Sequence, residues 1–257
     1  MKFKDNIAFV SGGLGDLGKA IAIKLAEQGA HISVADIKDP KDSLELEKKV
    51  KSLGRKFLYV KADLSEAKNV IAWHDATKKQ IGTPDIIIYS SAIINVVKSF
   101  MEVTDAQWEN EIGVNLNTAF YMSKTCSQAL MQEKKAGRIV LIGSWAGHVV
   151  HSHIPSYCVS KAGLRMLCQC IAKELAPYNI IVNEIAPGYV DAGLSGRFFE
   201  KDPVAKEASK QKVPNRQLIS SEEVADNVLF LCDPNNKHMV GSTLLMDGGL
   251  SLTIQGK

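Results

Sequence analysis

A tyrosine and a lysine lie four residues apart in the stretch SYCVSK, as Tyr157 and Lys161. If this segment is helical, a four-residue step returns to nearly the same face, so the two side chains project side by side. A phenol with its ordinary pKa of about 10 is a poor base near neutral pH, but a neighbouring ammonium stabilises the phenolate. The pair could then take a proton from a hydroxyl group. Many surface helices have this spacing by accident, so the rest of the chain must supply the context.

A glycine-rich segment, VSGGLGDLGKA, follows the first apolar run, and its Gly13, Gly15 and Gly18 fit GxGxxG. Glycines allow a tight turn and a close approach of the backbone to a pyrophosphate, which the free amides and dipole of a helix N-terminus favour. The segment therefore predicts a dinucleotide site. A glycine-rich turn that serves packing alone is the alternative.

Asp36 ends the second expected strand, 18 residues after Gly18. A carboxylate there can accept hydrogen bonds from ribose hydroxyls and would repel a 2′-phosphate, which favours NAD over NADP. Ile37 follows it and offers no positive charge, whereas Lys38 is the nearest residue that would favour NADP. A strand-end or turn role for Asp36 stays open.

Short apolar, β-branched runs alternate with longer amphipathic segments, which is typical of a parallel sheet with helices on both faces. No Pro/Gly/Ser-rich linker divides the chain. We therefore expect an α/β fold: a single-domain, Rossmann-type, doubly wound, seven-stranded parallel sheet flanked by helices, over residues 1–257. The strands are expected at 6–10, 31–36, 56–60, 85–89, 138–142, 179–186 and 242–246, and the helices at 16–28, 43–53, 66–80, 105–135, 156–176 and 221–232.

The segment 191–213 breaks this alternation because it is polar and lies between the last two expected strands. A doubly wound fold keeps its substrate lid in such an insertion at the carboxyl end of a strand. A solvated helical excursion is the alternative.

The composition argues against several classes of partner. The chain has 31 basic and 28 acidic residues, a net charge of +3, which is too balanced for nucleic acid or an anionic membrane as the main partner. Five cysteines without a CxxC argue against a disulfide framework and a metal site, and a reducing cytoplasm fits best. The N-terminal apolar run is too short for a signal peptide, and the apolar block at 86–94 is shorter than the roughly 18 residues of a spanning helix.

With these features in place, the sequence resembles the short-chain dehydrogenase/reductase family. The resemblance covers essentially the whole chain and rests on VNL at 114–116, GRIVLIGS at 137–144, YCVSK at 157–161, VNEIAPGYV at 182–190 and MDGG at 246–249. It implies an enzyme that interconverts alcohols and ketones with a nicotinamide cofactor. It also implies a homotetramer, in which the helices at 105–135 and 156–176 pack against copies of themselves.

The resemblance implies a catalytic tetrad of Asn115, Ser144, Tyr157 and Lys161. Tyr157 would be the base, Lys161 would lower its pKa and bind the nicotinamide ribose, and Ser144 would hydrogen-bond the substrate oxygen. Asn115 would hold a water that links Lys161 to solvent. The bland alternatives are a strand-end cap for Ser144, a helix-interior polar group for Asn115, a core position for Tyr157 and a solvated charge for Lys161.

The cofactor-binding residues include some carried over with less support, and one departure from the family pattern. Asp63 resembles a residue that meets the adenine amino group, although a helix N-cap is the alternative. Asp16 stands where the family has a glycine, and we expect its carboxylate to face away from the pyrophosphate. The full set is Ser11, Gly12, Gly13, Gly15, Asp16, Leu17, Gly18, Asp36, Ile37, Asp63, Leu64, Ser91, Ala92, Tyr157, Lys161, Pro187, Gly188 and Val190.

The substrate pocket is expected to be polar, because three histidines, His148, His151 and His153, precede Tyr157. A sugar, polyol or sugar acid is therefore favoured over a long acyl chain. Reduction of a 3-oxoacyl thioester is the alternative, and a dinucleotide-binding sensor without catalysis is a more distant one. The candidate substrate residues are Asn95, Trp145, His151, His153, Tyr189 and Arg197.

Overall fold

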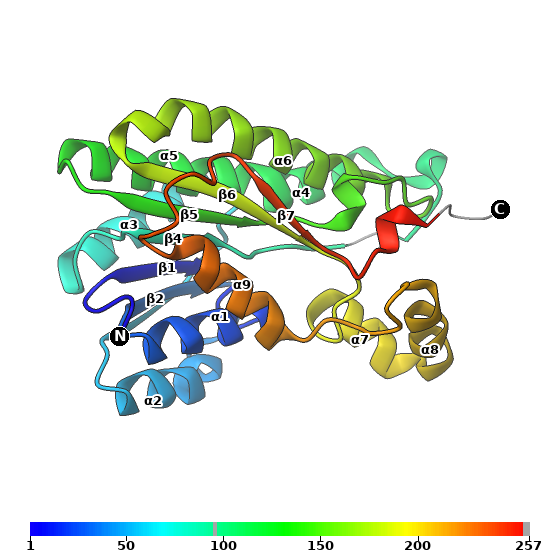
Figure 1. The fold of residues 1–257 in the computed structure, drawn as a ribbon, viewed down its shortest axis with the longest axis horizontal. Helices are drawn as coiled ribbons and strands as arrows, with labels where there is room; N and C mark the ends of the chain where they lie inside the picture. The colour runs from blue at the N-terminus through cyan, green and yellow to red at the C-terminus, as the bar shows by residue number, and fades with distance from the viewer. Residues whose placement is uncertain (95–96, 254–257) are drawn as a thin grey trace.

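The computed structural model describes residues 1–94 and 97–253, so the candidate Asn95 lies outside the described residues. Its centre is a seven-stranded sheet in the order β3-β2-β1-β4-β5-β6-β7 (Figure 1). All neighbouring strands run parallel. The order reverses between β1 and β4, which is the doubly wound arrangement that the sequence predicts. The strands are β1 (Ile7–Ser11), β2 (His31–Asp36), β3 (Phe57–Lys61), β4 (Ile86–Tyr89), β5 (Gly137–Ile142), β6 (Ile180–Pro187) and β7 (Thr243–Met246).

Helices cover both faces of this sheet (Figure 1). One face packs against α1 (Asp16–Glu27), α2 (Leu44–Ser52) and α9 (Ser221–Cys232). The other face packs against α3 (Ala67–Gln80), α5 (Thr118–Gln132) and α6 (Pro155–Leu175), beside the shorter α4 (Asp105–Ile112). Within the described ranges, no helix combines the length and apolarity that a bilayer crossing requires.

The central strands read as continuous apolar runs because both of their faces are buried. In β1, Ala8 and Val10 join the core under α1 and α9, while Phe9 between them joins the opposite core. Phe9 stacks on Trp73 of α3 with ring centroids 3.4 Å apart. The alternation along one strand thus builds two separate cores.

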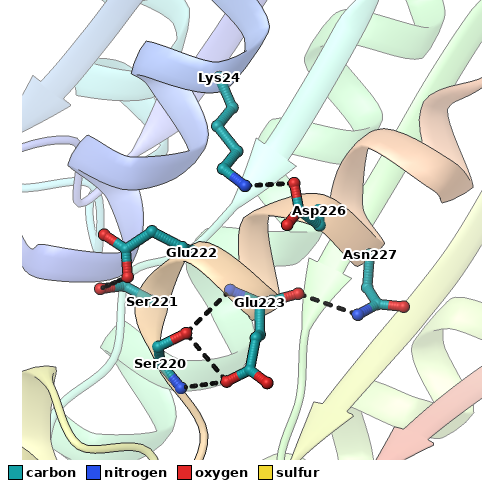
Figure 2. Close-up of polar contacts among 7 residues, drawn as sticks. All are labelled: Lys24, Ser220, Ser221, Glu222, Glu223, Asp226 and Asn227. Carbon is teal, nitrogen blue, oxygen red and sulfur yellow. Dashed lines mark hydrogen bonds and ion pairs between the residues drawn. The ribbon is translucent and has the colours of Figure 1, made fainter.

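The first turn of α9 is fixed by a capping box. The Ser220 hydroxyl accepts from the backbone N–H of Glu223 at 3.2 Å, and the Glu223 carboxylate accepts from the Ser220 backbone N–H at 2.8 Å (Figure 2). An ion pair between Lys24 and Asp226 joins α9 to α1 (Figure 2). This pair is partly exposed and adds little free energy, so the buried Val224 and Val228 provide most of the attachment.

The helix expected at 105–135 runs continuously from Asp105 to Gln132, but a π-helical turn, Gly113–Asn117, lies inside it between α4 and α5. A π turn widens the backbone and releases a carbonyl from the regular helical ladder. Here the Val114 carbonyl accepts a hydrogen bond from the hydroxyl of Tyr89 at 2.9 Å. The interruption is therefore held by the end of β4, a tertiary contact that helical periodicity cannot reveal.

The expected break at 191–213 contains two further helices, α7 (Gly193–Lys201) and α8 (Pro203–Lys212). They lie beyond the end of β6 (Figure 1). No residue of α8 is buried, and only Gly196 and Phe199 of α7 are. We call residues 191–213 the lid segment.

Candidate active site

The helix α6 brings Tyr157 and Lys161 together, as the four-residue spacing predicts. The Lys161 Nζ lies 5.6 Å from the centroid of the Tyr157 ring and 5.6 Å from that of Tyr89. Tyr157 is 9% exposed and Lys161 only 1%. The interpretation of Lys161 as a solvated charge is therefore wrong. Its ammonium instead donates to the backbone carbonyl of Ile142, at the end of β5, at 2.8 Å.

Ser144 comes two residues after the end of β5 and lies beside the same pair of side chains, Tyr157 and Lys161. Its hydroxyl accepts from the backbone N–H of Ala146 at 3.2 Å, so it does cap a short 3₁₀ helix, Trp145–Gly147. The Ser144 side chain also lies beside the phenol of Tyr157 and acts to lower its pKa. The capping role and a role beside the phenol are thus compatible in one residue.

Burial moves the pKa values of this pair in opposite directions. It raises the pKa of Tyr157 to about 12, although Ser144 acts to lower it. It lowers the pKa of Lys161 to about 8, while the carboxylate of Glu184 acts to raise it. The phenol of the protein alone is therefore protonated near neutral pH, and only additional positive charge beside it makes it a base.

Asn115 lies in the π turn and is fully buried. Its Oδ1 accepts from the backbone N–H of Ile93 at 2.8 Å, and its Nδ2 donates to the Ile93 carbonyl at 2.9 Å. The same Nδ2 lies 3.3 Å from the hydroxyl of Ser160 on α6. Asn115 thus ties the segment after β4 to the helix that carries Tyr157. We call Asn115, Ser144, Tyr157 and Lys161 the polar cluster.

Three glycines in and beside the loop between β1 and α1 occupy positions where a side chain does not fit well. Gly12 has a φ of +60°, where side chains are strained, and a Cβ there would lie 3.2 Å from the Ser90 carbonyl oxygen. A Cβ on Gly13 would overlap Val34, and one on Gly18 would overlap the Gly12 carbonyl oxygen. This cradle, which leads into the first turn of α1, fits the pyrophosphate of a dinucleotide.

Ser11 ties this loop to the end of β4. Its buried hydroxyl accepts from the backbone N–H groups of Ser90 and Ser91, at 3.0 and 3.2 Å. The small residues Ser90 and Ser91 therefore lie beside the glycine-rich loop at the carboxyl ends of β1 and β4, where the strand order reverses, and the partly buried Ala92 follows them. This is where a doubly wound sheet binds its ligand.

Asp36 lies at the end of β2 with its carboxylate turned to the glycine-rich loop. It accepts from the backbone N–H of Leu14 at 3.1 Å and from that of Lys38 at 3.3 Å. The Lys38 ammonium in turn donates to the Leu14 carbonyl at 2.7 Å. Beside them lies an open cavity of about 480 Å³, lined by Leu14, Lys19, Lys38, Lys41, Asp42 and Glu45. Negative and positive groups therefore both border the expected adenosine site.

The other candidate cofactor residues are spread along the carboxyl edge of the sheet. Asp63 is not the N-cap of α3, because Glu66 holds that position and the Asp63 carboxylate accepts from Ser65 instead. Ile37 is 69% exposed. Leu64, Pro187 and Val190 are buried, Leu17 is partly buried, Gly15 is the N-cap of α1, and Gly188 packs so closely on Asp247 that a Cβ would not fit.

The carboxylate of Asp16 engages the lid segment. It accepts from the backbone N–H of Gly193, the first residue of α7, at 2.7 Å. The residue that departs from the family pattern therefore joins the glycine-rich loop to the lid segment, 177 residues further along the chain.

The candidate substrate residues are only partly brought together. The Trp145 ring meets Tyr189 at 5.5 Å and His151 at 6.0 Å between centroids, and Tyr189 meets Phe199 of α7 at 6.4 Å. These rings form an aromatic wall between the polar cluster and the lid segment. His153 and Arg197, by contrast, are exposed.

His148 is engaged elsewhere, with its Nδ1 2.8 Å from a guanidinium nitrogen of Arg165. The described residues contain no group of histidines, cysteines or carboxylates that could hold a metal ion.

Three residues near the polar cluster were not predicted from the sequence to belong to the site. Tyr89 places its ring beside Lys161, Glu111 is buried and bonded to the hydroxyl of Ser156, and Glu184 is buried in β6. The signal for Glu184 was a carboxylate inside the apolar run NIIVNEIA. Tyr89 and Glu111 carry no such signal, because aromatic residues are common in strands and glutamates in helices.

Comparisons with known proteins find related sequences and similar folds. A family model described as enoyl-(acyl carrier protein) reductase matches residues 14–251. The 2-dehydro-3-deoxy-D-gluconate 5-dehydrogenase of Dickeya dadantii is 28% identical over 243 residues, 95% of this chain and 94% of the relative. The 3-oxoacyl-(acyl-carrier-protein) reductase FabG of Buchnera aphidicola is 29% identical over 97% of this chain and 99% of its own. A crystal structure from Agrobacterium tumefaciens with bound NADP superimposes with a TM-score of 0.88 at 25% identity, covering 98% of each chain.

Proposed function

Because this chain belongs to the short-chain dehydrogenase/reductase family, we propose that it is an NAD(H)-dependent oxidoreductase that interconverts a polar secondary alcohol and its ketone. The observation that carries the proposal is the buried pair of Tyr157 and Lys161 beside Ser144. Few other reactions need a phenol, an ammonium and a hydroxyl converging in one place.

In this proposal the phenol oxygen of Tyr157 takes the hydroxyl proton of the alcohol. When bound, the oxidised nicotinamide would supply the hydride acceptor, and its positive charge would favour ionisation of the phenol. Lys161 supplies the second positive charge. Ser144 donates a hydrogen bond to the substrate oxygen as negative charge develops there. Asn115 holds the segment after β4 against α6, the helix that carries Tyr157 and Lys161.

The glycine-rich loop and the first turn of α1 would hold the cofactor pyrophosphate, and Asp36 would accept hydrogen bonds from the adenosine ribose. The Asp36 carboxylate favours NAD because it would repel a 2′-phosphate. The lysines of the neighbouring cavity would instead favour NADP, because their positive charges attract a 2′-phosphate. The related structure from Agrobacterium tumefaciens also holds NADP. NADP is therefore the second choice.

A sugar acid, sugar or polyol is the proposed substrate class. The aromatic wall and His151 offer stacking surfaces and a neutral imidazole, because burial lowers the pKa of His151. The similarity to a 2-dehydro-3-deoxy-D-gluconate 5-dehydrogenase supports this class. Reduction of a 3-oxoacyl thioester is the second candidate, favoured by the similarity to FabG.

The domain with its lid segment, the oligomeric state and the location in the cell complete the proposal. We propose one domain over residues 1–257, in which the lid segment closes over the substrate. Phe120 on α5 and Val159 and Met166 on α6 are exposed apolar side chains, which supports a homotetramer built on these helices. The five cysteines form no disulfide, which supports a cytoplasmic location.

The test is a screen for NAD-linked oxidation over polyols, aldoses, uronates and hydroxy acids, with 3-oxoacyl thioesters and NADPH as the competing arm. We expect activity on one of the polar classes, and its loss in Tyr157→Phe but not in the control Tyr178→Phe, an exposed tyrosine. Binding of NADH without turnover of any compound would support the sensor alternative instead. Undiminished activity of Tyr157→Phe would contradict the assigned base.

A further inference from the structure

Glu184 is a carboxylate in the interior of the sheet. It lies in β6 opposite Leu141 of β5 and is 0% exposed. Because side chains alternate along a strand, it shares the face of Ile180 and Val182, which pack in the core beneath α5 and α6. A carboxylate in such a place costs free energy unless other groups compensate its charge.

The immediate contacts of this carboxylate are incomplete. Its Oε2 accepts from the hydroxyl of Thr243 on β7 at 2.6 Å. Its Oε1 is buried without a hydrogen-bond partner in the described part of the chain. A Cβ on Gly143 would overlap this Oε1, so only glycine at position 143 leaves space for it. The carboxylate therefore lies against the backbone that joins Ile142 to Ser144.

The ammonium of Lys161 is bound to the same stretch of backbone. It donates one hydrogen bond to the Ile142 carbonyl and retains further N–H donors. Burial raises the pKa of Glu184, and Lys161 and Arg165 act to lower it. In the reverse direction, Glu184 is the group that opposes the effect of burial on the pKa of Lys161. Each charge thus compensates the burial of the other.

We propose that Glu184 is a positioning residue for proton transfer: its buried carboxylate keeps Lys161 charged beside Tyr157. This inference rests on the proposed function, and it adds a residue on β6 to the polar cluster. In the proposed reaction the Lys161 ammonium interacts with two negative groups, the Glu184 carboxylate and the Tyr157 phenolate that forms when the phenol loses its proton.

Other titratable groups face these residues and enter any pH dependence. Tyr89 and Tyr157 flank Lys161, and Glu111 acts on Tyr157 from α4. Arg165 and Cys168 of α6 face Glu184, and Arg165 is partly engaged with His148. Thr243 is the neutral group on β7. Among these described groups, Lys161 is the one cation that is buried beside the phenol.

The first test is the pH dependence of alcohol oxidation. Lys161 must be charged to stabilise the phenolate, so the rate falls on the alkaline side as Lys161 loses its proton. Glu184→Gln should move this alkaline limb of kcat to lower pH by about one unit, the size of effect that a nearby opposite charge produces. Glu184→Asp keeps the charge and should keep the limb. An unchanged limb in Glu184→Gln would show a merely structural role and overturn the inference.

The second test does not depend on activity. A double-mutant cycle of Glu184→Gln and Lys161→Met, measured by urea unfolding, should show favourable coupling at about pH 7 that disappears at about pH 10, where Lys161 is neutral. Asp85→Asn in place of Glu184→Gln is the matched control, because Asp85 is bonded to Asn6 and Ile7 at the opposite end of β4. It should show no coupling. Absence of coupling for Glu184 at both pH values overturns the inference.

If Glu184→Gln does not fold, Lys161→Met against wild type answers the same question. Without the ammonium, the folded-state pKa of Glu184 rises further above its unfolded value. Stability should then fall more steeply as the pH rises from acid to neutral in Lys161→Met than in wild type. Parallel curves overturn the inference. Coupling without turnover of any screened compound would instead overturn the proposed function, and activity without coupling overturns this inference alone.

Discussion

The polar cluster and the lid segment are neighbours in space but are built in opposite ways. All four members of the polar cluster are buried, and hydrogen bonds tie three of them to backbone groups of other segments or to the next turn. The lid segment is largely exposed, and α8 buries no residue at all. Local stability follows such differences in burial. We infer that the reaction depends on the rigid region, and the choice of substrate on the loosely held one.

The largest effect is expected from Lys161→Met, which removes the positive charge beside the phenol. Activity on the best screened alcohol should fall about a thousandfold, within the range of acid and base catalysis. Steady-state kinetics against Lys173→Met, an exposed lysine further along α6, provides the comparison. A loss smaller than about tenfold would place the essential charge outside the polar cluster.

Ser144→Ala should come next, because it removes one hydrogen-bond donor to the substrate oxygen. We expect kcat to fall about a hundredfold with little change in KM, as for the loss of one donor to a developing oxyanion. The exposed Ser52→Ala is the control. A change confined to KM would mean that Ser144 holds the ground state and not the transition state.

Asp36→Asn tests the expected adenosine site at the end of β2. Without the carboxylate, the preference for NAD over NADP, measured as the ratio of kcat/KM values, should fall about tenfold. Asp39→Asn, three residues further along and paired with Lys61, should leave the ratio unchanged. If the wild-type enzyme already prefers NADP, the lysine-lined cavity would be the binding site of the 2′-phosphate.

The smallest effect should come from the contact that joins the glycine-rich loop to the lid segment. Asp16→Asn weakens the hydrogen bond to Gly193, and we expect the substrate KM to rise about threefold with kcat nearly constant. Hydrogen exchange at the Gly193 amide should quicken in the same variant. An equal loss in kcat would show that this bond organises the polar cluster as well.

The sequence predicts most of the sheet and of the polar cluster. The strand positions and the meeting of Tyr157 with Lys161 were predictable because apolar runs and helical spacing are local signals. Features that depend on distant partners were not. The π turn depends on Tyr89, and the environment of Glu184 depends on Gly143 and Thr243.

The lid segment was less predictable for a related reason. Its polar sequence fits both a lid and a solvated helical excursion, and the structure shows helices with few buried residues. Its attachment through Asp16 joins positions 177 residues apart, which no local pattern records. Arg197 was predicted to contact the substrate because of its charge. It is exposed, on a face of α7 other than the one that buries Gly196 and Phe199.

The most direct test of the account is a single-turnover measurement of NADH formation by enzyme mixed with NAD and the best alcohol. Wild type and Tyr157→Phe are compared, with NADH binding followed by fluorescence as the control for an intact cofactor site. We predict that Tyr157→Phe binds NADH as wild type does but forms it at least about a hundredfold more slowly. Equal rates of NADH formation would mean that another group takes the proton, and would contradict the central role of the buried phenol.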